Sequence, residues 1–210
     1  NELIELARNN NPELKMLLNK YLASKQLVNV MKTLDYPQFG FETIGQNKMY
    51  TISQVIPFPG KLYQKGLVAE YESKAVEQEL KLKELEIFAE IKKLYWNYWL
   101  VNKKIEIYKE NINIMKRFLD IAIGQYTVGK VTQADILKIN IEVAKMEEML
   151  IMLELEEKVS IISELNTLLN RRPETSLGKP EQPQLPELKY TLEELETFAL
   201  TNNPDIKSKE

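Results

Sequence analysis

The side chains that most often perform catalysis or bind metals are scarce in this chain. Its 210 residues include no histidine and no cysteine, so the commonest general base and every thiolate site are missing. Carboxylates and lysines are plentiful, but no spacing singles out a pair for acid–base chemistry. The 7 glycines form no phosphate-binding motif. We therefore expect no catalytic residue, no cofactor and no enzymatic activity.

One group of side chains does suggest a metal. Met146, Met149 and Met152 recur at intervals of three residues, which places them along one side of a helix. Thioethers bind copper, but methionine is also a flexible filler of helical cores. Because no histidine or cysteine accompanies them, we favour packing and predict no metal site.

Composition excludes several classes of protein. A net charge of -3 and a pI near 5.4 are unlike the clustered basic charge of nucleic-acid-binding proteins. Hydrophobic residues make up 44% of the chain, too many for a disordered protein. No apolar run reaches the roughly 18 residues of a membrane-spanning helix. The polar start, "NELIELARNN", is not a signal peptide, so we expect a mature chain if the protein is exported.

Periodicity divides the chain into helices and one hairpin. Apolar residues near the 3.6-residue period predict helix over residues 2–34, interrupted by "NNNP". Two arms with period-2 alternation, each about nine residues, flank the polar turn at residues 45–48 and predict a β-hairpin. Phe39, Phe41, Tyr50 and Ile52 share one face of it. Tilted strands that cross an outer membrane have about 9–11 residues, but a hairpin packed on a helix in water has the same pattern.

A very long helix follows the hairpin. Residues 61–125 contain no proline, which predicts a helix of about 60 residues, or roughly 90 Å. "YTVGKVTQAD" ends it, and a further helix is expected over residues 133–169. The two shorter helical segments together match the long one, so we expect them to pair with it end to end. In "IPFPGK", Pro57 and Pro59 remove backbone donors, Gly60 permits a sharp turn, and Lys61 begins the helix.

The end of the chain repeats its beginning. Residues 171–190 are rich in proline and predict a linker. After it, "ELETFALTNNPDIK" (194–207) matches "ELIELARNNNPELK" (2–15) at seven of fourteen positions. An internal repeat of this kind indicates a duplicated unit, and we expect this chain to be about the first half of a longer protein.

These segments, in this order, resemble the TolC-like outer-membrane efflux protein family. The resemblance rests on "NNPELK", "PQFGF", "ISQVIPFPGKL", "QYTVGKVTQADIL" and the second "NNPDIK". The proline-glycine-lysine corner is similar to the heavy-metal and cation efflux branch. The chain departs from the family in its short hairpin turn, in Asn170 where a helix-ending glycine is common, and in the missing second repeat. Asparagine also accepts the left-handed conformation of such a cap.

The resemblance implies a fold and a domain order. The chain would be mainly α, with long antiparallel helical hairpins of the α-barrel type and one short β-hairpin contributing to an outer-membrane β-barrel. The implied order comprises a first helical segment (1–35), the β-hairpin (36–57), a long helical hairpin (58–170) with its tip at 126–132, a linker (171–190) and the start of a second repeat (191–210).

The resemblance also implies a function and its residues. The protein would be the passive outer-membrane channel of a tripartite efflux pump, with a periplasmic extension, and a homotrimer when full length. An inner-membrane pump and a periplasmic adaptor would be its partners, and nucleic acid would not. Phe39, Phe41, Tyr50 and Ile52 would face outer-membrane lipid, and the corner would comprise Pro57, Pro59, Gly60 and Lys61. The adaptor-docking tip would comprise Tyr126, Val128, Gly129, Thr132 and Asp135.

Two points remain as hypotheses. Thr132 and Asp135 have the spacing of a capping box, and copies of Asp135 around the entrance would favour cations. The alternative function is a soluble or periplasmic coiled-coil adaptor or scaffold, whose long hairpin binds a partner helix.

Overall fold

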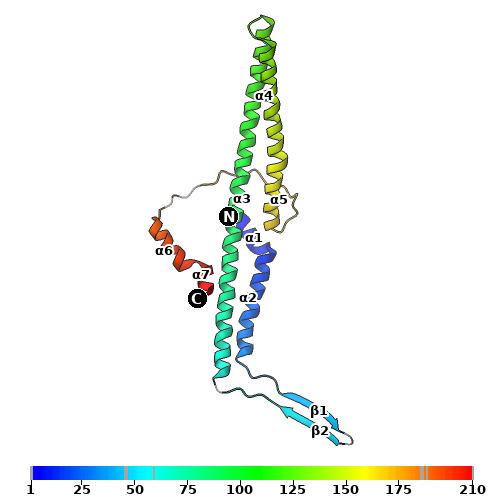
Figure 1. Ribbon diagram of the computed structural model, residues 1–210, viewed down its shortest axis with the longest axis vertical. Helices are drawn as coiled ribbons and strands as arrows, with labels where there is room; N and C mark the ends of the chain where they lie inside the picture. Colours follow the sequence, from blue (N-terminus) through cyan, green and yellow to red (C-terminus); the bar gives the residue numbers. More distant parts are fainter. Residues whose placement is uncertain (1, 45–46, 59, 185–186, 188, 210) are drawn as a thin grey trace. The chain divides into compact units, whose positions relative to one another are not determined.

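The computed structural model describes residues 2–44, 47–58, 60–184, 187 and 189–209 (Figure 1). The chain forms two compact units, one of residues Asn1–Asn11 and Ile87–Leu188, and one of Pro12–Glu86 and Lys189–Glu210. The elements, in order, are α1 (Glu2–Asn10), α2 (Pro12–Met31), β1 (Gln38–Ile44), β2 (Asn47–Ser53), α3 (Lys61–Thr127), α4 (Gln133–Met152), the π-helix η1 (Leu153–Glu157), α5 (Lys158–Leu168), α6 (Leu192–Asn202) and α7 (Pro204–Lys209). The predicted class, mainly α with one β-hairpin, is confirmed.

In the first unit, α4, η1 and α5 run antiparallel to the second part of α3 (Figure 1). Val101 and Ile105 of α3 are buried against Leu153, the first residue of η1. Two ion pairs join the rims of the helices, Lys109–Glu154 at 2.6 Å and Lys116–Glu147 at 2.7 Å. The helix predicted over residues 133–169 is interrupted by one π-helical turn, η1. This turn begins at Leu153, whose side chain is buried in the core.

Helix α1 belongs to the same unit and meets the end of α5. The buried Asn11, just after α1, donates a hydrogen bond from Nδ2 to the carbonyl oxygen of Leu168 at 2.9 Å. The guanidinium of Arg8 lies 5.0 Å from the ring centre of Phe88, a cation–π contact. The first helix is thereby attached to both helices of the unit.

The segment after α5 is held against α3 by tyrosines. Tyr98 is 3% exposed, and its hydroxyl donates to the carbonyl oxygens of Leu177 and Gly178. The hydroxyl of Tyr95 donates to the carbonyl of Glu181 and accepts from its N–H, both at 3.1 Å. The aromatic stretch around residue 96 thus packs a proline-rich segment onto the helix.

In the second unit, α2 runs beside the first part of α3 (Figure 1). Lys20–Glu79 at 2.8 Å and Glu13–Lys83 at 3.0 Å link their surfaces. The side chain of Lys32 lies over Gly66, where a Cβ would come within 2.6 Å of its Cγ.

Strands β1 and β2 form a two-stranded antiparallel sheet. Its register pairs Phe39 with Ile52 and Phe41 with Tyr50. Each strand has seven residues, so the prediction of about nine was wrong. Pro37 has no N–H to extend the ladder, and just beyond Ser53 the side chain of Gln54 donates from Nε2 to the carbonyl oxygen of Asp35 at 3.3 Å. Residues 45–46 of the expected turn lie outside the described residues.

Asn170 ends α5 in the left-handed conformation, with φ of 53°, as expected from the sequence. Its N–H donates to the carbonyl of Thr167 at 3.0 Å, and the N–H of Arg171 donates to that of Asn166 at 2.8 Å. These two bonds form a Schellman cap. Asn166 is fully buried and its Nδ2 holds the carbonyls of Pro173 and Thr175, so this end of α5 also fixes the start of the next segment.

We predict that Asn170→Ala lowers the free energy of unfolding by about 1 kcal/mol. Alanine has a Cβ but no polar side chain that could hydrogen-bond the local backbone, so it disfavours positive φ more than asparagine does. Asn170→Gly, the matched control, should leave stability within about 0.5 kcal/mol of the parent because glycine accepts this conformation. Urea unfolding followed by circular dichroism measures both. Equal loss in the two variants would contradict the assignment.

Candidate functional site

The tip of the helical hairpin begins with a Schellman cap that ends α3. Gly129 has φ of 73°, and its N–H donates to the carbonyl of Tyr126 at 2.9 Å. The N–H of Lys130 donates to the carbonyl of Gln125 at 3.0 Å. The prediction that "YTVGKVTQAD" ends the long helix is therefore confirmed, and Gly129 is the residue that closes it.

A capping box opens α4 and completes the tip. The backbone N–H of Asp135 donates to Oγ1 of Thr132 at 3.3 Å, and that of Thr132 donates to Oδ2 of Asp135 at 3.1 Å. The hydroxyl of Thr132 also donates to the same carboxylate oxygen at 2.6 Å. The predicted capping box is confirmed, and each side of the turn is held by its own cap.

The capping contacts alter the charge properties of Asp135. Hydrogen bonds from the hydroxyl of Thr132 and then from its backbone N–H lower the pKa of this carboxyl, and the nearby charge of Lys138 lowers it further. Nζ of Lys138 lies 3.9 Å from Oδ1. The carboxylate is therefore stabilised in its charged form, but one of its oxygens is already occupied by the cap.

The turn presents apolar side chains to solvent. Tyr126 is 47% exposed, Val128 66% and Leu137, in the first turns of α4, 54%. Because the caps fix the backbone on both sides, these side chains are held on a rigid turn. All five residues predicted for the tip lie together within this one stretch, and the structure adds Leu137, which the sequence analysis did not single out.

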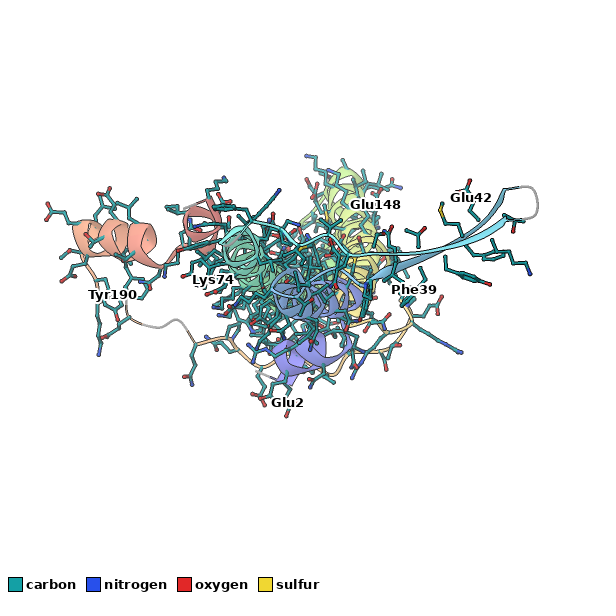
Figure 2. All side chains as sticks on the ribbon, turned by 90° about the horizontal axis from the view of Figure 1, so that it is seen from below. Glu2, Phe39, Glu42, Lys74, Glu148 and Tyr190 are labelled. Atoms are coloured by element: carbon teal, nitrogen blue, oxygen red, sulfur yellow. The ribbon has the colours of Figure 1, made fainter. Side chains whose placement is uncertain are left out.

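The four side chains predicted for the membrane face lie together on one side of the sheet. Phe39, Phe41, Tyr50 and Ile52 are all 59–75% exposed. The rings of Phe41 and Tyr50 lie 5.2 Å apart between centres. Glu42 leaves the opposite side of the sheet from Phe39 (Figure 2). Such a contiguous exposed apolar surface marks an interaction site.

The corner between β2 and α3 turns at Gly60. Its φ of 94° is a conformation that glycine adopts readily, and its carbonyl accepts the N–H of Gln64 at 2.9 Å to start α3. Pro57 precedes the turn, and Lys61 is the first residue of the helix. Pro59 lies outside the described residues.

The segment before the corner holds a feature that the sequence analysis missed. Val55, Ile56 and Phe58 are 70–82% exposed although they lie in no strand or helix, and Tyr36, just before β1, is 92% exposed. The sequence signal for this exposed segment is the apolar run "VIPF" at residues 55–58, which its alternation predicts only as the end of a strand. These side chains extend the apolar surface of the hairpin toward the helices of the second unit.

The described residues contain no group of three or more acidic side chains arranged to hold a metal ion. Met146, from the suggested copper group, is half-buried, while Met149 and Met152 are exposed. Within the same described ranges, no helix combines the length and the apolar character that spanning a membrane requires.

We predict that Thr132→Ala raises the pKa of Asp135 toward its ordinary value, because both the hydroxyl donor and the cap geometry are lost. A carboxyl whose pKa is lower in the folded protein than in the unfolded chain stabilises the fold at pH values above its unfolded pKa. This stabilisation is lost as the pH falls through its folded pKa. The variant should therefore lose less stability on acidification than the parent does.

Carboxyl-carbon NMR titration measures the pKa of Asp135. Thr127→Ala is the control, since the Thr127 hydroxyl bonds only within α3, to the carbonyl of Gly124 at 2.7 Å. An unchanged pKa in Thr132→Ala would refute the proposed cause.

Solved structures of outer-membrane channels have the same fold. The chain aligns with CusC at a TM-score of 0.78 and 19% identity, over 99% of this chain and 52% of CusC. For VceC of Vibrio cholerae the TM-score is 0.74 at 17% identity, over 89% and 51%. For CmeC of Campylobacter jejuni it is 0.73 at 18% identity, over 99% and 49%. The chain thus spans about half the length of these proteins.

A comparison of the sequence with curated proteins returned no match. The model of the outer membrane efflux protein family matches residues 3–168, about four-fifths of the chain. The match covers α1 from its second residue and the complete α3–α4–α5 hairpin. It confirms the resemblance drawn from the sequence, and with it the location at the outer membrane with a periplasmic extension. The family is one of efflux channels and not of enzymes. The chain belongs to the outer membrane efflux protein family.

Proposed function

We propose that this chain forms part of the passive exit duct of a tripartite efflux pump. The observation that carries the proposal is the family match over a long hairpin whose tip is capped on both sides. In this role the protein catalyses no reaction, and an inner-membrane pump supplies the energy. The cargo would be small molecules or metal cations, and the similarity of the "PFPGK" corner to the cation branch favours cations. Family membership argues against the alternative of a soluble adaptor or scaffold.

The duct requires more than this chain, which spans about half of the similar channels. In the proposed arrangement, residues 36–57 supply strands to a barrel in the outer membrane, where Phe39, Phe41, Tyr50 and Ile52 face lipid. The corner from Pro57 to Lys61, including Pro59, leads into the periplasmic helices of residues 58–170. Residues 171–190 link this repeat to a second one that begins at 191, and the full protein is a homotrimer.

The tip is proposed to dock a periplasmic adaptor protein. Tyr126 and Val128 supply exposed apolar contacts, and the caps built by Gly129, Thr132 and Asp135 hold them in place. A preordered apolar turn loses little conformational entropy on binding, which favours its use as a docking element.

We predict that Tyr126→Ala/Val128→Ser weakens binding of the adaptor about tenfold or more, because truncating exposed anchor residues removes most of their contact area. The matched control is Tyr63→Ala/Val68→Ser, a tyrosine and a valine of similar exposure on the first part of α3. Binding is measured by surface plasmon resonance with the adaptor immobilised. Equal weakening in both variants would argue against docking at the tip.

The cation hypothesis for Asp135 needs a variant that keeps the cap. Asp135→Ala would remove the bonds to Thr132 together with the charge, whereas Asp135→Asn retains an acceptor for the N–H of Thr132. We predict that Asp135→Asn lowers the preference for cations over anions in single-channel recordings of the reconstituted protein. Unchanged selectivity would reject the charge hypothesis while leaving the duct itself intact.

A further inference from the structure

Three lysines gather where α2 ends and α3 begins. Lys32 directly follows the last residue of α2, and Lys61 and Lys65 lie in the first two turns of α3. Because Lys61 and Lys65 are four residues apart, they lie on the same side of the helix. All three side chains are exposed. We name these three residues the basic band.

Packing of α2 on α3 brings the lysines of the two helices together. The side chain of Lys32 crosses α3 at Gly66, where a Cβ would lie 2.7 Å from Cε of the lysine. Gly66 directly follows Lys65, so the lysines from α2 and α3 lie at the same level of the helix pair. A hydrogen bond of 3.1 Å between the hydroxyls of Ser24 and Ser73, about two turns further along α3, holds the helices in this register.

The charge at this end of the second unit is unbalanced. Residues 21–36 and 54–69 contain four lysines, one aspartate, no glutamate and no arginine, a net charge of +3 in a chain whose net charge is -3. Glu70, the next acidic residue along α3, is paired with Lys74 at 2.9 Å. That hydrogen bond and the charge of Lys74 lower the pKa of Glu70, and the charge of Lys32 contributes least.

No ion pair neutralises the basic band within the part of the chain that the structure describes. A lysine ammonium is a compact cation with three hydrogen-bond donors, which suits the oxygens of a phosphate group. The band therefore offers three cationic groups to an anion from outside the chain.

The chain between the β-hairpin and the basic band is apolar and exposed. Val55, Ile56 and Phe58 are 70–82% exposed and come just before α3. Two tyrosines accompany them, Tyr36 at 92% and Tyr63 at 64% exposure. Tyrosine is enriched where the apolar part of a membrane meets its headgroups, and lysine keeps its stem on apolar surface while its ammonium reaches the polar side. The order of apolar segment, tyrosine and lysine is thus the order met on leaving a membrane.

We propose that the basic band binds the phosphate groups of anionic phospholipids in the leaflet that faces the periplasm. Lys32 and Lys65 hold one phosphate between the two helices, and Lys61 contacts a headgroup one turn nearer the hairpin. Charge complementarity selects the ligand, and the exposed apolar segment beside the band receives the adjoining acyl chains. This inference rests on the proposed placing of the hairpin in lipid.

The proposal is tested by flotation of the 210-residue chain with two kinds of vesicle. One kind is an equal mixture of phosphatidylglycerol and phosphatidylcholine, and the other is phosphatidylcholine alone. The chain should bind the anionic vesicles more tightly. Raising the ionic strength should remove this difference, because salt screens charges at a surface.

Neutralising the basic band should remove the same difference at low ionic strength. Lys32→Gln/Lys61→Gln/Lys65→Gln should weaken binding to the anionic vesicles about a hundredfold, or about fivefold for each lysine, and leave binding to phosphatidylcholine unchanged. The matched control Lys92→Gln/Lys93→Gln/Lys104→Gln removes equal charge from three exposed lysines on α3 in the first unit. It should change binding less than about twofold, since charges beyond the screening length contribute little.

A charge-retaining variant separates the role of charge from that of folding. Lys32→Arg/Lys61→Arg/Lys65→Arg should bind the anionic vesicles as the parent does, because it keeps three cations in place. Circular dichroism should give the same helix content for all variants. Weak binding of this variant despite normal helix content would overturn the proposal.

Three further results would overturn the inference alone. They are equal binding of the parent to both kinds of vesicle, equal weakening in the control variant, and release from the vesicles by inorganic phosphate at constant ionic strength. The last result would assign the band to free phosphate instead of lipid. Absence of binding to either kind of vesicle would overturn the proposed placing of the hairpin in lipid as well.

Discussion

Helix α3 has 67 residues and cannot bury its apolar side chains alone, and the rest of the chain is organised around this constraint. A long helix in water is stable only where neighbouring elements cover its apolar faces. In the second unit α2 supplies that cover, and in the first unit α4, η1 and α5 supply it together with α1. The tyrosines of α3 also attach the proline-rich segment after α5, so even this irregular stretch serves the same helix.

Rigidity at the tip follows from two helix caps rather than from a large core. Gly129 closes α3 through backbone geometry, and Thr132 and Asp135 close the start of α4 through side-chain bonds. Short connections between antiparallel helices leave little room for packing, so hydrogen bonds to the free backbone groups fix the turn. The tip can therefore present Tyr126 and Val128 in a constant arrangement, which suits a docking role.

The uncovered surfaces carry the function proposed for this protein. Exposed apolar groups gather on one face of the β-hairpin, on the segment before Gly60 and on the tip. In the proposed function, the face of the β-hairpin meets lipid and the tip meets an adaptor. Contiguous exposed apolar surfaces of this kind mark interaction sites.

Local rules in the sequence determined the elements and the caps. The period of the apolar residues indicated the helices, and Gly129, Asn170 and the pair Thr132/Asp135 indicated their ends, because caps depend on neighbours within a few residues. The length of the strands was overestimated, since the alternation of "TISQVI" continues past Ser53, where the opposite residue, Pro37, has no N–H for the ladder. Only the tertiary structure revealed that Tyr95 and Tyr98 hold the proline-rich segment, and that Lys109 is level with Glu154 and Lys116 with Glu147. Those relations join residues far apart in the chain, and helical periodicity alone does not specify which turn of one helix lies beside which turn of another.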